Sequence, residues 1–272
     1  MGYYTQADGD YSFAMGRQAY ARGKSSVAFG DNNIAIGNYS YTEGSGLSSG
    51  ISLTGEANTK IYTYGESSFV ESRITEGLFV SYKNSYAQII QLDKDNRVIT
   101  LTSSLSSEAL NATTVTIFLG GASVGTNSHV EGECTTAGGD YSHSEGEYTI
   151  AGSKGQHVQG RYNITDISNT HAHIVGNGRS YSQRSNAHTL DWDGNAWYSG
   201  DVYVGSTSGI DKDEGSKKLA TEDYVNESLV AITLERITEI CGIEPVMAFA
   251  VNDEGDALVN AGWPDDNGNI QI

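Results

Sequence analysis

Apolar, polar and glycine positions recur along the chain with a period of seven residues, over two separate stretches. In the first stretch, short segments of apolar and small residues each end in glycine: 12–16, 26–30, 33–37 and 40–44. In the second stretch, histidines recur in the same frame every 14 residues: His129, His143, His157 and His171. Self-similarity at a fixed period predicts a repeat architecture in which each unit packs on its neighbours.

The seven-residue unit predicts a short strand followed by a turn, and two units would complete one coil of a flat parallel β-solenoid. Each coil adds about 4.8 Å, the spacing of neighbouring strands. Residues i and i+2 of a strand share a face. We therefore expect Phe13 and Met15 to point into the core and the small Ala14 to point outward, with the same arrangement in 26–30 and 33–37.

Between the two stretches the repeat is lost and apolar and polar residues alternate. Segments 86–92 and 97–102, joined by a turn at 93–96, predict a β-hairpin, and 113–119 predicts a further strand. The organisation expected is a first β-solenoid block at 1–50, an inserted β module at 51–120, a second β-solenoid block at 121–184, an intertwined or hairpin β element at 185–216, a short helix or coiled coil at 217–242 and a small tip or tail at 243–272. Such an insertion is expected to project sideways from the solenoid.

The C-terminal helix is predicted from a change to helix-forming residues. Thr221 is placed to cap it, and Val225, Leu229 and Ile232 recur at helical spacing. Because this apolar stripe is too short for an isolated helix, a short trimeric coiled coil and a helix packed on the tip are the two alternatives. The expected fold is all-β: a trimeric parallel β-solenoid or β-roll fibre with an inserted β module and a short C-terminal helical coiled coil.

The charge balance narrows the partners of the chain. With 34 acidic and 16 basic side chains and a net charge of −18, it has no basic run for phosphate contacts, so no nucleic acid is expected. No apolar stretch approaches the roughly 20 residues that span a bilayer, so no membrane insertion is expected. Cys134 and Cys241 lie in different predicted modules, and we expect two free thiols rather than a disulfide.

The candidate chemistry lies in the second block, where each histidine shares a strand face with the residue two positions on. The pairs form a predicted ladder: His129 with Glu131, His143 with Glu145 and His157 with Gln159. One interpretation is a catalytic or metal-binding stack, and the other is a hydrogen-bonded polar ladder that fixes the register. A motif repeated in every coil favours architecture, so we expect no enzymatic activity.

The segment 171–173 differs from the other repeats because a second histidine takes the Glu position. If His171 and His173 faced a threefold axis, three chains would present six imidazole nitrogens, a set suited to a transition metal. No cofactor is required for folding in this interpretation. The alternative is that the pair faces the roll interior of one chain.

Because a flat ribbon builds only a thin core, we expect the chain to associate into a closed oligomer.

The motifs also resemble those of two known groups of proteins. Segments 26–30 and 33–37 resemble the head repeats of trimeric autotransporter adhesins, which are left-handed parallel β-rolls assembled as trimers. The Ser-His-x-Glu-Gly repeats, with 185–205 and 218–225, resemble tail-fibre and minor structural proteins of phages and prophages of Gram-positive bacteria. Phage fibres are known to contain His-x-His metal sites, so this resemblance also implies a metal at 171–173.

These resemblances imply a bacteriophage virion fibre of the tail-fibre or receptor-binding type, which acts as an elongated trimeric structural and host-adhesion element. Its implied partners are itself as a homotrimer, other virion proteins at the N-terminal side, and a host cell-surface glycan or wall polymer bound through Tyr and Trp. It would be made in the cytoplasm of the host bacterium and be extracellular in the assembled virion. The alternatives are a cell-surface trimeric adhesin and a tailspike enzyme that degrades a bacterial polysaccharide.

Overall fold

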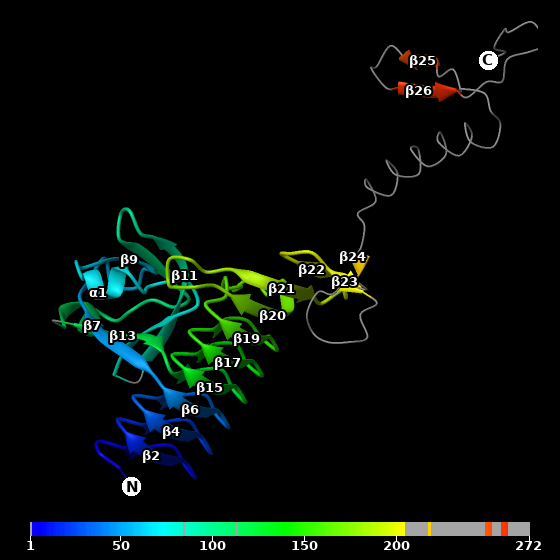
Figure 1. The fold of residues 1–272 in the computed structure, drawn as a ribbon. Helices are drawn as coiled ribbons and strands as arrows, with labels where there is room; N and C mark the ends of the chain where they lie inside the picture. The colour runs from blue at the N-terminus through cyan, green and yellow to red at the C-terminus, as the bar shows by residue number, and fades with distance from the viewer. Residues whose placement is uncertain are drawn as a thin grey trace, which may run out of the picture. The chain divides into compact units, whose positions relative to one another are not determined.

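The computed structural model describes residues 2–83, 85–112, 114–204, 217–218, 248–251 and 257–260. These residues lie mostly in β-strands and include two short helices, which confirms the prediction of a mainly β chain built on a β-solenoid (Figure 1). Neither helix in this part of the chain has the length and apolar character needed to span a membrane. The chain divides into two units, Met1–Gly200 and Asp201–Ile272, and the solenoid belongs to the first.

The solenoid has one wall of long strands and one wall of short strands. The long strands pair in parallel in the order β2 (Phe13–Arg17), β4 (Val27–Asp31), β6 (Tyr41–Ser45), β15 (His129–Glu133), β17 (His143–Glu147), β19 (His157–Arg161) and β20 (His171–Asn177). The short strands pair in the order β1 (Gln6–Ala7), β3 (Tyr20–Ala21), β5 (Ile34–Ala35), β14 (Ala122–Ser123), β16 (Thr136–Ala137) and β18 (Ile150–Ala151). In the first block, partners lie 14 residues apart, as Phe13 and Val27 do.

The two blocks form one continuous solenoid, although an inserted module separates them in sequence. Strand β6 pairs with β15 so that Tyr41 lies beside His129 and Gly44 beside Gly132. On the other wall, Ile34 of β5 lies beside Ala122 of β14. The chain thus leaves the solenoid, builds the module and returns to the next rung in register.

The module is a seven-stranded antiparallel sheet with two short helices. The strand order is β7 (Leu47–Ile51), β13 (Val115–Gly120), β10 (Phe79–Tyr82), β11 (Ser85–Asp93), β12 (Val98–Leu101), β9 (Ile61–Tyr64) and β8 (Leu53–Thr54). Helices α1 (Ser68–Glu71) and α2 (Ser107–Asn111) begin at serine N-caps, Ser67 and Ser106, whose side chains accept a backbone N–H. Alternating apolar positions give the module a buried core of its own.

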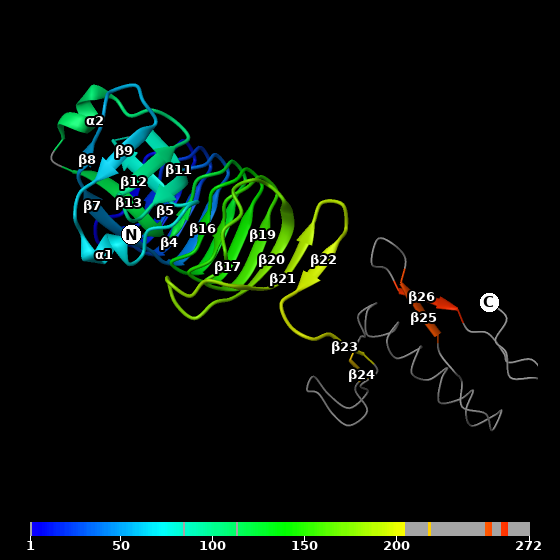
Figure 2. The same ribbon diagram turned by 90° about the horizontal axis from the view of Figure 1, so that it is seen from above.

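The module packs directly against the solenoid (Figure 2). Ile150 of the short-strand wall is 1% exposed and belongs to the module core. The Gln88 side chain of β11 donates to the carbonyl oxygens of Gly77, in the module, and Gly152, in the solenoid, at 3.2 Å each. These contacts fix the position of the module on the coils that follow it in sequence.

The turns of the solenoid repeat a left-handed backbone conformation every seven residues. Positive φ values of 53° to 59° occur at Tyr11, Gln18, Ser25, Asn32 and Tyr39 in the first block. Glycines in the long strands let the backbones of neighbouring coils come close together. A Cβ on Gly30, whose φ is +123°, would lie 2.0 Å from the carbonyl oxygen of Gly44 in the next coil.

The faces of the long strands are the reverse of our expectation. Phe13, Met15 and Phe29 are 51%, 36% and 41% exposed, whereas the small side chains face the interior. The interior cluster of the first block contains Ala19, Ala21, Ala28 and Ala35, with Ala14 packed against it. The second block fills the interior with Val130, Ser144 and Val158, so its His and Glu residues also face outward. Small side chains therefore fill the interior of the first block, and the large side chains of β2 and β4 face outward.

Beyond the last coil, β21 (Asn186–Asp191) and β22 (Ala196–Tyr198) extend the long-strand wall as an antiparallel hairpin. In the C-terminal unit, β23 (Tyr203–Val204) pairs with β24 (Lys217–Lys218), and β25 (Ala248–Val251) pairs with β26 (Ala257–Asn260), both antiparallel. Apart from β24, the coiled coil predicted at 217–242 lies outside the described residues.

Cys134 is a buried free thiol at one of the left-handed turn positions, with φ 52°. Burial is the main cause that raises the pKa of this thiol to about 11, so it carries no thiolate at neutral pH. Cys241 lies outside the described residues.

We expect Gly30→Ala to destabilise the solenoid, because a side chain would be forced into an unfavourable φ and against the Gly44 carbonyl. Backbone strain of this kind costs about 1–3 kcal/mol, measurable as a lower free energy of unfolding in urea. Gly50→Ala is the matched control, because the nearest atoms to its new Cβ would lie at an ordinary 3.5 Å. An equal loss of unfolding free energy in the two variants would contradict the close contact between Gly30 and the Gly44 carbonyl.

Candidate functional site

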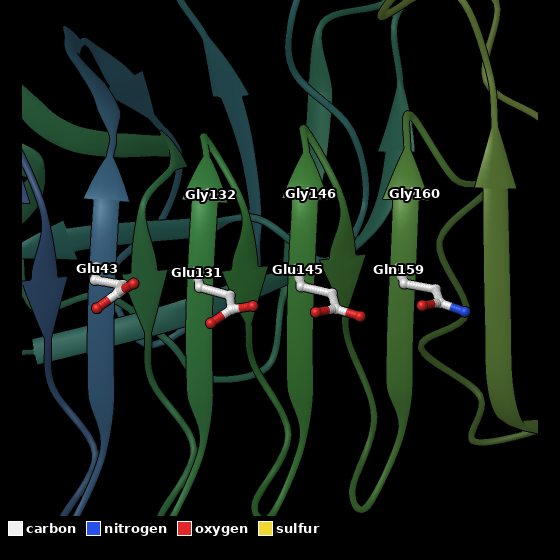
Figure 3. Close-up of a pocket in the computed structure, with 7 residues that line it drawn as sticks. All are labelled: Glu43, Glu131, Gly132, Glu145, Gly146, Gln159 and Gly160. Atoms are coloured by element: carbon white, nitrogen blue, oxygen red, sulfur yellow. The ribbon is translucent and has the colours of Figure 1, made fainter.

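The outward face of the long-strand wall carries two columns of side chains, one residue from each strand. The imidazole column contains Tyr41, His129, His143, His157 and His173. The carboxylate column contains Glu43, Glu131, Glu145 and Gln159, and ends at Val175 (Figure 3). The six residues expected to form a ladder therefore lie together, on the outer face of the solenoid.

The histidine rings stack at the spacing of the strands. The ring centroids of His129 and His143 are 4.6 Å apart with an angle of 6° between planes, and those of His143 and His157 are 4.8 Å and 7° apart. Tyr41 packs edge-on against His129 at one end, and His173 lies tilted against His157 at the other. Parallel strands in register bring identical side chains into this arrangement without any ligand.

The two columns are joined by contacts between imidazole and carboxylate groups. His129 Nε2 lies 3.8 Å from Glu131 Oε2, and His157 Nε2 lies 3.5 Å from Glu145 Oε1. At the two ends, the Tyr41 hydroxyl donates to Glu43, and Gln159 Nε2 lies 3.4 Å from His173 Nε2. The side chains of His129 and His157 are each 42% exposed, so solvent screening keeps these ion pairs weak.

Protonation of His143, at the centre of the imidazole column, is disfavoured. Burial lowers the pKa of His143, and the neighbouring His129 and His157 rings lower it further, against a smaller opposing effect of Glu145. His173 also has a lowered pKa, from burial first and then from His157 and His188. Adjacent cations less than 5 Å apart repel each other, so the stack favours neutral imidazole at its centre.

The carboxylate column lines a shallow hollow of about 490 Å³ together with Gly132, Gly146 and Gly160. Within the described residues, one group of three metal-ligating side chains has its donor atoms within 4.8 Å of one another: His129, Glu131 and His143. The two imidazoles are stacked nearly parallel, so their nitrogen lone pairs do not converge on one point. Both interpretations of the ladder, the metal-binding stack and the polar ladder, stay predictions.

The register of the last coil differs from the 14-residue frame. His157 lies beside His173, not His171, so the assignment of His171 to the histidine column is wrong. The coil between them has 16 residues, because the loop before β20 replaces a regular turn and short strand. A β-bulge between His171 and His173, in the pairing with β21, further separates the two side chains.

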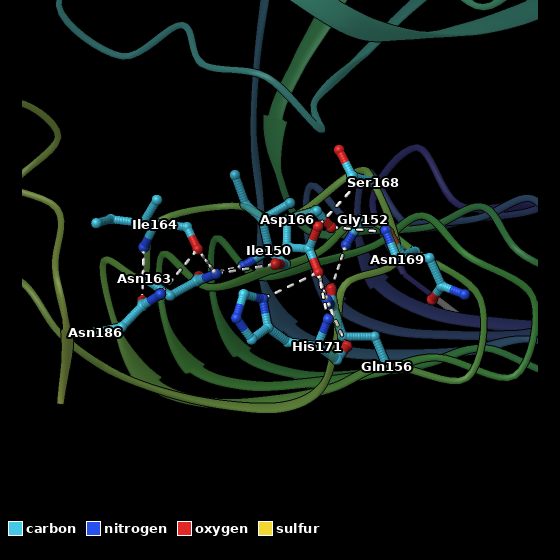
Figure 4. Close-up of polar contacts among 11 residues, drawn as sticks. Ile150, Gly152, Gln156, Asn163, Ile164, Asp166, Ser168, Asn169, His171 and Asn186 are labelled. Carbon is cyan, nitrogen blue, oxygen red and sulfur yellow. Dashed lines mark hydrogen bonds and ion pairs between the residues drawn. The ribbon is translucent and has the colours of Figure 1, made fainter. Parts of the chain in front are cut away.

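His171 is held in a polar cap at the end of the solenoid (Figure 4). Its backbone N–H donates to Asp166 Oδ2 at 2.8 Å, its ring Nδ1 lies 3.3 Å from the same oxygen, and the ring packs edge-on against Trp197. His173 instead contacts His157 and His188. The metal predicted at His171 and His173 concerns three chains around an axis and stays a prediction.

Two cap residues that the sequence reasoning missed are Gln156 and Asn163, both fully buried. Asn163 accepts from the Ile150 N–H at 2.8 Å and donates to the Ile150 carbonyl at 3.1 Å, so it replaces the next short strand. Gln156 donates to Asp166 and to the His171 carbonyl. At the equivalent position one coil earlier, the Thr149 hydroxyl donates instead to the Glu145 carbonyl, four residues before it, so the repeat frame alone does not reveal the role of Asn163.

We expect stability to fall as pH drops below about 6.5, and His143→Gln to reduce that fall. A lowered pKa in the folded state means that the unfolded chain binds more protons, so acid favours unfolding. The free energy of unfolding in urea would be compared between about pH 7.5 and about pH 5.5 in both proteins. An unchanged pH dependence in the variant would contradict a role for His143 in this effect.

The comparison with known families finds the YadA head domain repeat in two copies, at residues 1–19 and 7–33. These residues form the first coils of the solenoid. Searches of curated proteins and of solved structures find no match to the chain. The head repeats and the β-solenoid together are the features of a fibre-like or adhesin-like repeat protein.

Proposed function

We propose that the chain is a segment of a bacteriophage virion fibre of the receptor-binding type, which forms a homotrimer and attaches the particle to its host. The observation that carries the proposal is the outward face of the long-strand wall. In the first block that face carries Phe13, Met15 and Phe29, all at least 36% exposed in a single chain. Proteins with YadA-like heads form homotrimers in general, and the match to this repeat favours the same assembly here.

The apolar side chains form one continuous surface with the histidine column. Phe13 and Val27 lie in register with Tyr41, and Tyr41 with His129. Contiguous exposed apolar surface marks an interaction site, and fully burying a Phe side chain contributes about 1.5–3 kcal/mol. Three copies around one axis would cover this face on every chain and close the assembly.

The histidine column supports the same packing. The Nε2 atoms of His129, His143 and His157 are shielded from water and make no hydrogen bond within the chain. Polar atoms shielded from water usually have a partner. The nearest acceptors are the Glu131 carboxylate, 3.8 Å from His129 Nε2, and the Glu145 carboxylate, 3.5 Å from His157 Nε2. Packing of a second chain on this face would bring them into hydrogen-bond distance.

Adhesion is assigned to exposed aromatic side chains. Tyr11, Tyr39 and Tyr141 are 88%, 52% and 60% exposed at equivalent turns of the solenoid, and Trp192 and Trp197 are more than half exposed on the terminal hairpin. Aromatic faces with a polar tip suit host glycans and wall polymers. Other virion proteins would attach at the N-terminal side, and the fibre would be extracellular in the assembled virion.

A cell-surface trimeric adhesin is the second candidate, and the YadA head repeat favours it. We prefer the phage fibre because the second-block repeats and the segment 185–205 resemble phage structural proteins. We propose no enzymatic activity and no required cofactor, because the Glu131 and Glu145 rungs repeat as architecture.

The trimer is tested by changing the proposed interface. The native protein is expected to have three times the chain mass of 29.0 kDa in light scattering. Phe29→Asp would place a carboxylate in an apolar contact and beside Glu43, so association should weaken by at least about tenfold. Tyr11→Asp, at a turn, is the control and should remain trimeric. A monomeric native protein would overturn the assembly.

Attachment is tested with labelled protein on a panel of Gram-positive bacteria and their purified walls. We expect saturable binding to a subset of hosts, and pre-incubation of those cells with the protein should reduce phage adsorption. Antibodies to the chain should label the particles themselves in electron micrographs. Binding without any particle labelling would favour the cell-surface adhesin, and no binding across the panel would count against both candidates.

A further inference from the structure

A groove of about 320 Å³ lies where the module meets the first coils of the solenoid. We call it the junction groove; the solenoid contributes residues beside β3 and β5, and the module contributes residues of β10 and β13 with Lys83. Its lining includes Arg22 and Lys83 and contains no carboxylate. In a chain with 34 acidic and 16 basic side chains, this local charge is opposite to that of the whole molecule.

Arg22 is fixed at the wall of the groove by contacts from both parts of the fold. Its guanidinium lies over the Tyr20 ring, 5.5 Å from the centroid, and Nη1 donates to the Tyr86 hydroxyl and to the Lys83 carbonyl. Its Nε is shielded from water and has no hydrogen-bond partner, with the nearest carboxylate, Asp8, at 4.0 Å. Nη2 makes no hydrogen bond within the described residues, so the positioned guanidinium keeps one donor for an anion.

The rest of the lining is polar and aromatic. Asn33 is fully buried, and its amide donates to the carbonyls of Phe29 and Gly44, but its Oδ1 has no partner. The aromatic Tyr20 and Phe118 also line the groove. Aromatic side chains beside a few fixed polar groups are typical of small-molecule sites, and sugar rings present both an apolar face and hydroxyls.

We propose that the junction groove binds an anionic saccharide unit, with Arg22 pairing with its carboxylate or phosphate group. This inference rests on the proposed adhesive function and names the ligand class and the site. Lys83 is held by a close ion pair with Glu108, outside the groove lining. Asp8, also outside the lining, lies 4.0 Å from Arg22 Nε, at the limit of an ion pair, so Arg22 is the anchoring cation. The groove volume suits one or two sugar rings rather than a long polymer in full contact.

The test measures binding by calorimetry and saturation-transfer NMR to the full chain. The probes are a glucuronic-acid disaccharide for carboxylate, glucose 6-phosphate for phosphate, and a neutral glucose disaccharide. At least one anionic probe should bind about tenfold or more tightly than the neutral one, since a hydrogen bond to a charged group contributes about 1.5–3 kcal/mol. The stronger anionic probe distinguishes an acidic polysaccharide from a phosphate-bearing wall polymer.

Arg22→Ala should lose that preference, and Arg22→Lys should keep part of it because the charge remains without the planar fork. Arg17→Ala is the matched control, since Arg17 is exposed on the solenoid, pairs with Asp31 and lies outside the groove. Circular dichroism verifies that each variant is folded. Equal binding of neutral and anionic probes, absence of binding by native protein, or native-like binding by Arg22→Ala would overturn the proposal.

A measurement of binding to host bacteria distinguishes failure of the groove proposal from failure of the proposed fibre function. If the native protein attaches to bacteria but binds neither anionic probe, the groove proposal is wrong and the fibre proposal stands. If the native protein binds an anionic probe through Arg22 but attaches to no host and forms no trimer, the fibre proposal is wrong and the groove proposal stands.

Discussion

The close stacking of one 14-residue coil on the next constrains the rest of the molecule. A glycine of each coil lies under the carbonyl of the glycine one coil on, closely enough that a Cβ on Gly16 would lie 1.9 Å from the Gly30 oxygen. The interior between the two walls holds small and β-branched side chains, as at Ala28, Val130 and Ile174. Large side chains therefore have one place to go, the outside of the sheet, where a neighbouring chain or a ligand can cover them.

The same constraint places the histidines in a regular column on the outer face of the solenoid. Parallel strands in register place like beside like, so a histidine at one rung stacks on a histidine at the next. An uninterrupted column of charges would repel itself. In this stack, burial and the neighbouring His129 and His157 rings lower the pKa of His143, and a carboxylate lies near each flanking ring, Glu131 near His129 and Glu145 near His157.

The seven-residue period was enough to predict the solenoid and the continuation of its frame after the insertion, and the alternation of apolar and polar residues predicted the hairpin of β11 and β12. It was not enough to predict which strand face is buried. Alternation identifies two faces but does not say which one is buried: in the structure Phe13 is 51% exposed, whereas Ala14 packs against the interior alanine cluster. The frame also misplaced His171, because two additional residues in the last coil carry a cap in which Asp166 takes over a role filled elsewhere by strand pairing.

The inserted module gives the solenoid a distinctive surface that a regular repeat cannot form. A solenoid presents the same surface at each rung, so its columns can carry a regular interface but no single distinctive site. The module leaves at β6, returns at β15 and preserves the register between them, so it adds its own sheet without interrupting the coils. Its contact with the short-strand wall creates a corner found in no other coil of the described chain. Arg22 belongs to an ordinary half-repeat, and the Tyr86 and Lys83 contacts from the module are what set it apart from the equivalent residues of other coils. In the proposed function, assembly would use the repeated face, and the junction would add selective recognition to the binding by exposed aromatic side chains.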